Sequence, residues 1–208
     1  MTVRLHRGDL PDLSRYTGSV AIDTETMGLH PHRDRLCVVQ LSNGDGSADV
    51  VQIPRDHGKA RGDAANLKAL LGDPKVTKIF HFARFDIAAL NNAFGVMPQP
   101  VYCTKIASRL ARTYTDRHGL KDLVREVLNI DLSKQQQSSD WGSERLSEAQ
   151  LAYAASDVLH LHALRERLDA MLAREGRLEL AQACFEFLPT RARLDLQGWD
   201  TEDIFAHS

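Results

Sequence analysis

The sequence has few cysteines and no long apolar run. Its three cysteines, Cys37, Cys103 and Cys184, are scattered along 208 residues, which excludes a disulfide framework and a tetrahedral zinc site. No apolar stretch approaches the length of a membrane span, and the N-terminal residues lack the apolar core of a signal peptide. We therefore expect a cytoplasmic protein with reduced thiols and no membrane partner.

The sequence also lacks an excess of positive charge. Lys and Arg number 26 against 28 Asp and Glu, so the net charge is −2. A protein that grips many phosphates of a long nucleic acid generally carries a basic surface, because phosphate neutralisation releases counterions. Any contact with nucleic acid should therefore be local. A chain of this size with 43% hydrophobic residues predicts a single domain over residues 1–208.

Four short runs rich in β-branched residues predict buried strands, at residues 19–23, 36–41, 49–53 and 76–80. The first three runs are joined by short polar turn segments, which leave no room for crossover helices. Those three strands should therefore be antiparallel neighbours. The strand pattern predicts a mixed sheet.

Helical spacing of apolar residues dominates the second half of the chain. It predicts helices around residues 67–71, 85–90 and 120–128, and a long helix over 147–176 that begins at a serine cap and ends at a glycine. A last helix should run from 177 to about 187, with a tail to 208 that is rich in aromatic residues. The fold class is therefore α/β, with a helical C-terminal part.

Acidic residues end the first predicted strand and follow the last. Asp23 and Glu25 are two apart, so both side chains point to one face of a strand. Asp86 comes early in the helix after residues 76–80 and approaches that pair if the two strands are neighbours. Taken alone, the first pair is better explained by a solvated turn, and Asp86 by a first-turn acid that the helix dipole favours.

Tyr153 and Asp157 are four residues apart on the long predicted helix, so they share one face. Taken alone, such a pair is commonly a half-buried ring beside an exposed acid. Together with the three earlier acids it predicts a two-metal phosphodiesterase site, because hard divalent cations require several oxygen ligands.

Three motifs carry a resemblance to a known family: DTE at 23–25, HFARFD at 81–86 and YAASD at 153–157. They resemble the three exonuclease motifs of the DEDD superfamily, in its tyrosine-bearing branch typified by ribonuclease D. The segment KQQQSSDW at 134–141 is similar to the stretch that precedes the third motif in that family.

The resemblance implies a ribonuclease-H-like fold, two Mg²⁺ or Mn²⁺ ions, and hydrolysis from the 3′ end that releases 5′-mononucleotides. It implies that Asp23, Glu25, Asp86 and Asp157 are metal ligands, and that Tyr153 positions or deprotonates the attacking water.

Candidate substrate-binding residues are polar or aromatic side chains near these motifs. A solvated loop, turn chemistry and a histidine satisfied at a strand end are the alternatives for parts of this set. The candidates are Thr24, His81, Arg112, Tyr114, His118, Lys134, Gln135, Gln137, Ser138 and Trp141.

Along its whole length the chain resembles short bacterial homologues of ribonuclease D. This resemblance implies short RNA substrates, dinucleotides above all, and a closed homo-octamer in which residues 177–208 form an interface. Three alternatives stay open: a DNA 3′-5′ exonuclease, trimming of longer RNA, and a non-catalytic nucleic-acid-binding module.

Overall fold

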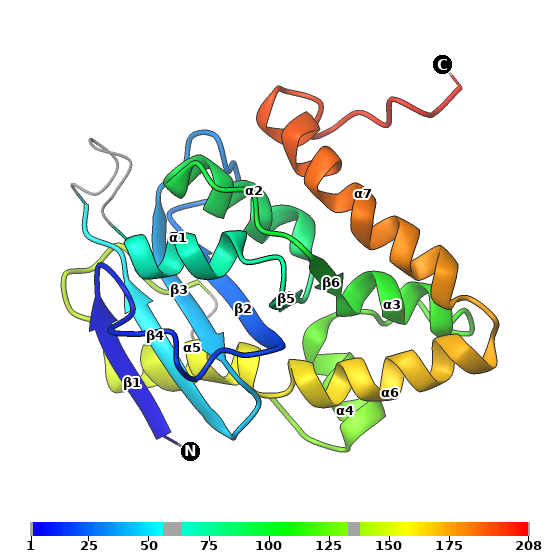
Figure 1. Cartoon of the computed structure of the whole chain (residues 1–208), viewed down its shortest axis with the longest axis horizontal. Coiled ribbons are helices and arrows are strands. Elements are labelled where there is room, and N and C mark those ends of the chain that lie inside the picture. The colour runs from blue at the N-terminus through cyan, green and yellow to red at the C-terminus, as the bar shows by residue number, and fades with distance from the viewer. Residues whose placement is uncertain (1, 56–63, 133–137, 208) are drawn as a thin grey trace.

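The structure is a computed structural model that describes residues 2–55, 64–132 and 138–207. It is a mixed α/β fold in which a six-stranded sheet is flanked by helices (Figure 1). The strands are β1 (Thr2–Arg7), β2 (Ser19–Thr26), β3 (Leu36–Ser42), β4 (Ser47–Gln52), β5 (Thr77–Phe80) and β6 (Val101–Cys103). The helices are α1 (Ala65–Gly72), α2 (Ala83–Phe94), α3 (Thr104–Ala111), α4 (Leu120–Leu128), α5 (Glu148–Leu159), α6 (Leu161–Arg174) and α7 (Leu178–Leu196).

The strand order across the sheet is β1-β4-β3-β2-β5-β6. Strands β2, β3 and β4 are antiparallel neighbours, as the short turns between them predict. Strands β2, β5 and β6 run parallel to one another. Because β2 and β5 are paired, the chain that leaves each of them emerges at the same edge of the sheet.

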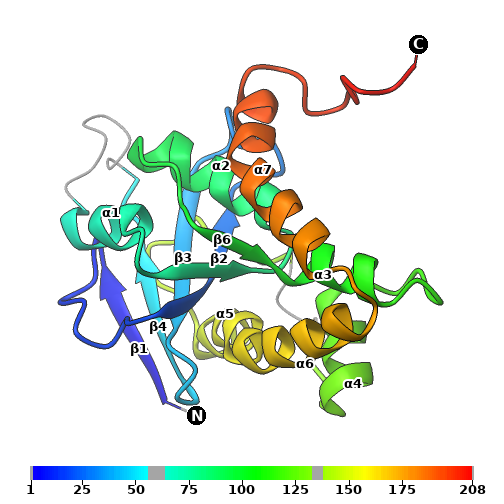
Figure 2. The same cartoon turned by 45° about the vertical axis from the view of Figure 1, so that its right-hand side comes forward.

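The sheet is covered on both faces, with α1 and α2 on one side and α5 on the other (Figures 1 and 2). Every residue of β3 is buried, as expected for a central strand between two helical layers. Helix α6 packs on α3 and α4, and α7 crosses α2 and β6. Within the described ranges no helix is both long enough and apolar enough to cross a membrane.

Two strands and one helix go beyond the sequence-based expectation. Strand β1 is an edge strand of alternating polar and apolar residues that pairs in parallel with β4, and β6 is only three residues long. Neither contains the run of β-branched residues by which the other strands were recognised. Helix α3 follows β6 with no residue between them. The pattern of apolar residues in so short a segment does not show where the strand ends and the helix begins.

The predicted helix over 147–176 is wrong in one respect, because it is interrupted at His160. Helix α5 packs on the sheet whereas α6 packs on other helices, and the sequence has no Pro or Gly at the junction to reveal the break. The C-terminal helix also continues past residue 187 to Leu196, through Pro189.

Candidate active site

The end of strand β2 presents two carboxylates. Asp23 lies opposite Gln40 of β3, whose Nε2 donates a hydrogen bond of 2.9 Å to Asp23 Oδ2. The pairing of β2 with β3 shifts register between Glu25 and Thr26. Such a bulge bends a strand and re-aims its side chains, and here it lies directly at the second carboxylate.

Asp86 reaches the same region from α2. Phe82 precedes this helix in the left-handed conformation, with φ of 71°, and the sharp turn places Asp86 in the first helical turn. The carboxylate is 3% exposed and accepts a hydrogen bond of 2.7 Å from Thr24 Oγ1. The residue between the two β2 carboxylates therefore holds the third one in place.

Helix α5 carries the tyrosine and the last carboxylate. A capping box at its start joins the Ser147 hydroxyl to the backbone N–H of Gln150, and the Gln150 side chain accepts from the backbone N–H of Ser147. The ring of Tyr153 packs against that of Trp141, with centroids 6.0 Å apart. Asp157 lies one turn further along the same face.

Asp23, Glu25 and Asp157 converge, since each offers an oxygen within 4.8 Å of the others. Burial, followed by the charges of Asp86, Asp157 and Glu25, raises the pKa of Asp23 well above its ordinary value. The pKa of Glu25 is raised to about 9 by burial and then by the charges of Asp157 and Asp86. Burial also raises the pKa of Asp86 and of Asp157 to about 7.

A cluster of four acidic residues with raised pKa values, three of them within 4.8 Å of one another, fits divalent cations. Bringing like charges out of water is unfavourable unless a cation compensates them. Oxygen ligands of this kind suit Mg²⁺ or Mn²⁺ rather than softer metals. Asp86 stands apart from the group of three, but its charge helps to raise the pKa of Asp23, so it belongs to the same acidic cluster. The site is therefore suited to divalent metal.

The cluster opens into a cleft of about 740 Å³. Thr24, His81, Ser138, Trp141 and Tyr153 line it, together with Asp23, Glu25 and Asp157. Several other lining residues have no signal in the sequence, because isolated lysines and apolar residues form no motif. They are Met27, Leu29, Phe85, Lys105 and Lys121.

His81 lies at the end of β5 in the neutral form. Its Nδ1 is 2.9 Å from Thr104 Oγ1. Its Nε2 is buried and has no hydrogen-bond partner within the described part of the chain. Burial, helped by the charge of Lys105, lowers the pKa of His81 to about 3. An uncharged imidazole beside a cleft can donate or accept one hydrogen bond without changing the charge of the site.

Three predicted substrate contacts do not line this cleft. Arg112 is fully buried, donates to Ser108 Oγ and Arg117 O, and forms an ion pair with Glu126. Tyr114 is exposed and donates to the same Glu126. His118 Nδ1 lies 2.9 Å from Ser108 Oγ.

These contacts place Arg112, Tyr114 and His118 away from the cleft, and their role in substrate binding stays a prediction. Together they fix the connection between α3 and α4 within the subunit. Lys134, Gln135 and Gln137 lie outside the described residues.

Comparison with known proteins gives matches over most of the chain. A family model described as 3'-5' exonuclease matches residues 10–173. Ribonuclease D of Acidiphilium cryptum is 41% identical over 161 residues, which are 77% of this chain and 39% of that protein. The chain thus spans about two fifths of the length of the curated ribonuclease D sequence it matches.

Two solved structures of Brucella melitensis NrnC match the chain over its full length and their own. The structure with bound Mg²⁺ is 61% identical, with a TM-score of 0.94. The structure bound to pGG is 62% identical, with a TM-score of 0.96. The DEDD-type motifs, the six-stranded sheet and these matches agree, so the chain belongs to the 3′-5′ exonuclease family, together with ribonuclease D and NrnC.

Proposed function

We propose that this protein is a 3′-5′ exoribonuclease that hydrolyses short oligoribonucleotides, dinucleotides above all, to 5′-mononucleotides. The observation that carries the proposal is the convergence of Asp23, Glu25 and Asp157 within 4.8 Å, in one cleft with Tyr153 and close enough to Asp86 for its charge to raise the pKa of Asp23. Burying carboxylates from three distant segments in one site is unfavourable unless a cation compensates their charges.

The carboxylates would hold two divalent cations, Mg²⁺ or Mn²⁺. Bound there, such ions make water a stronger nucleophile and stabilise charge on the leaving oxygen. Asp23, Glu25 and Asp157 form one group of ligands, and Asp86 extends the cluster toward a second position next to Asp23. Gln40 restrains Asp23 and Thr24 restrains Asp86, so both ligands are oriented before substrate arrives.

Tyr153 orients the attacking water in this proposal. Burial and the charges of Asp157, Glu25 and Asp23 raise the pKa of Tyr153 above its ordinary value. In this proposal the phenol, whose ordinary pKa is about 10, keeps its proton at neutral pH and donates a hydrogen bond rather than removing a proton. Contact with the Trp141 ring limits the orientations open to the tyrosine ring.

The cleft suits a substrate with few phosphates. Lys105 and Lys121 are the only lysines or arginines among the described residues that line it. A short RNA needs no more cationic contacts than these, whereas a long one gains affinity from many. The relative NrnC, whose structure holds pGG, supports a substrate of this class.

The C-terminal part is proposed to serve self-association into a homo-octamer in the cytoplasm. Several large apolar side chains stay exposed on α7 and the tail, where they would be covered by another subunit. They are Leu178, Leu180, Phe187, Trp199, Ile204 and Phe205.

Digestion of a 5′-labelled RNA ladder of two to ten nucleotides with Mg²⁺ tests the proposal. We expect mononucleotide release from the 3′ end, fastest for the dinucleotide, and no release by Asp157→Asn. Equal rates at all lengths would refute the length preference, and an active Asp157→Asn protein would refute the site. Matched DNA oligonucleotides in the same assay decide between RNA and DNA.

A further inference from the structure

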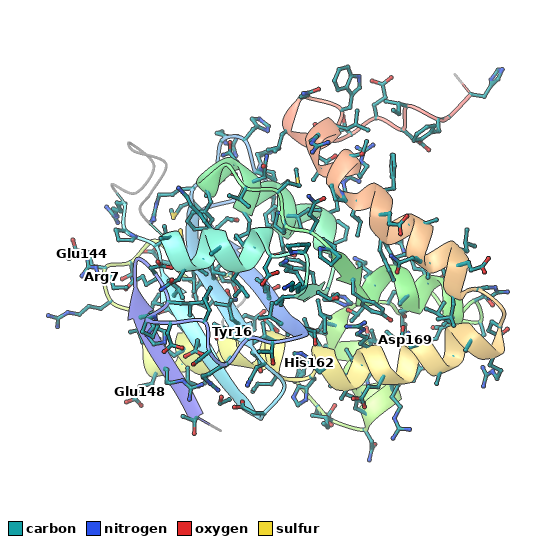
Figure 3. The ribbon with its side chains drawn as sticks, viewed as in Figure 1. Arg7, Tyr16, Glu144, Glu148, His162 and Asp169 are labelled. Atoms are coloured by element: carbon teal, nitrogen blue, oxygen red, sulfur yellow. The ribbon has the colours of Figure 1, made fainter. Side chains whose placement is uncertain are left out.

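A second polar cavity, of about 230 Å³, lies where β1 and β4 end. The loop that follows Trp141 forms its other wall, with Gly142, Ser143 and Glu144. Figure 3 shows Arg7 at the end of β1 and Glu144 near it, at the edge of the sheet away from α6 and α7. The ring of Trp141 belongs to the lining of both this cavity and the acidic cleft.

The cavity gathers three guanidinium groups, those of Arg7, Arg35 and Arg55, and a single carboxylate, that of Glu144. Among the described residues none of the three arginines forms an ion pair. By contrast, Arg4 and Arg15 nearby are both paired with Asp49. Within the described residues, the lining therefore carries three positive charges and one negative charge, in a protein whose net charge is −2.

Two of the three guanidinium groups donate hydrogen bonds to backbone carbonyls, which fix their positions without neutralising their charge. Arg35 Nη1 donates to the carbonyl oxygens of Ile53 at 3.0 Å and Leu36 at 3.3 Å. Arg55 Nη2 donates to Gly142 O at 3.1 Å. Arg7 makes no side-chain hydrogen bond with any other described residue. Fixed donors around an open space lower the entropic cost of binding an anion.

We propose that Arg7, Arg35 and Arg55 form a binding site for a phosphate monoester, separate from the acidic cleft. Guanidinium groups match phosphate oxygens with paired, charge-assisted hydrogen bonds. The cavity is smaller than a common small-molecule pocket, so it takes the phosphate group and leaves the rest of the ligand outside. A dianionic monoester balances the local charge better than the single charge on each phosphate of an RNA strand.

Calorimetric titration with inorganic phosphate and with a nucleoside 5′-monophosphate tests the site directly. A chelator is present throughout, so the four carboxylates of the acidic cluster have no cation with which to attract an anion. We expect one saturable site per chain for both ligands, in competition with each other. If only the nucleotide binds, its base rather than its phosphate is recognised, and the proposal is overturned.

Arg7→Ala and Arg55→Ala should each weaken phosphate binding by at least about tenfold, because each removes a charge-assisted hydrogen-bond donor. Arg145→Ala is the matched control. It removes the same charge from an exposed position in the same loop but outside the cavity lining. Unchanged binding in both cavity variants, or equal weakening in the control, would overturn the assignment.

Fluorescence locates the bound anion. The chain has two tryptophans, so Trp199→Phe leaves Trp141 as the only one. Phosphate should change Trp141 emission in that background with the same affinity as calorimetry gives.

Asp23→Asn should bind phosphate normally although the proposed hydrolysis is lost, so the two proposals can be refuted independently of each other. Tighter binding of an RNA with a free 5′-hydroxyl than of phosphate would instead indicate a surface for RNA strands.

Discussion

Tyr153 is a residue whose surroundings define its chemistry. Burial, and then the charges of three carboxylates, raise the pKa of its phenol, and an orienting role predicts that Tyr153→Phe lowers kcat by about 10²–10⁴-fold with little change in KM. The pH profile of the remaining activity should keep its shape, because the phenol does not titrate in the working range. Steady-state kinetics on a dinucleotide between pH 6 and 9 measures this. Loss of an alkaline limb in the variant would indicate a general base instead.

The acidic cluster predicts an unusual pH dependence of stability without metal. The folded-state pKa is about 7 for Asp86 and Asp157 and about 9 for Glu25, well above the ordinary unfolded values of about 4. The folded chain thus binds more protons than the unfolded one, and this contribution to stability is lost as pH rises from about 4 to about 9. With a chelator, Tm should be lower at pH 8.5 than at pH 5.5, and Mg²⁺ should restore it.

Asp157→Asn should raise the Tm of the chelated protein at pH 8.5, because it removes one of the repelling charges. At roughly 2–4 °C per kcal/mol for a chain of this length, a rise of a few degrees is measurable by calorimetry. Asp116→Asn, at an exposed carboxylate outside the cleft, is the control and should leave Tm unchanged. A lower Tm for Asp157→Asn would mean that the carboxylates do not repel one another.

The sequence predicts the position of some functional side chains but not of others. The alternation of Asp23 and Glu25 follows from strand geometry alone, and the structure brings both beside Asp157. Arginine is a residue type that commonly binds phosphate, yet the guanidinium of Arg112 is buried against Ser108 and Glu126. No local pattern shows whether an arginine faces solvent or the packing between two helices.

At the scale of elements, the start of α5 matters because this helix carries Tyr153 and Asp157. Ser147→Ala removes the capping hydrogen bond to Gln150 and should cost about 0.5–2 kcal/mol, measured by urea unfolding. Ser156→Ala, in the middle of the same helix, is the matched control. Its hydroxyl only donates back to the carbonyl of Tyr153, so little change is expected. Equal losses in both variants would show that the cap has no special role.

The elements that the sequence predicts well are those with strong local signals. The β-branched runs predicted β2 to β5, and the short turns gave the correct antiparallel order of β2, β3 and β4. Strand β1 is recognised only through its partner β4, and the break between α5 and α6 arises from what each half packs against. Tertiary contacts, which no local window contains, determine both.

At the scale of the whole molecule, the exposed apolar residues of the C-terminal part predict an assembly. The rings of Phe187 and Phe205 lie 5.9 Å apart, and Phe205 is 73% exposed. If this surface joins subunits, Phe205→Asp should lower the mass measured by light scattering, since a charge would be buried at the interface. Ile130→Asp, at an exposed position beyond α4, is the control and should keep the parent mass. A monomeric parent protein would refute the assembly.

The carboxylates that meet at the end of β2 come from early, middle and late segments of the chain. During synthesis, the sheet and α2 can form long before α5 has emerged from the ribosome. Until then Asp23, Glu25 and Asp86 stand without Asp157 and Tyr153, and the ligand set is incomplete. The proposed hydrolytic site is therefore completed only when its late helix, α5, has docked on the sheet.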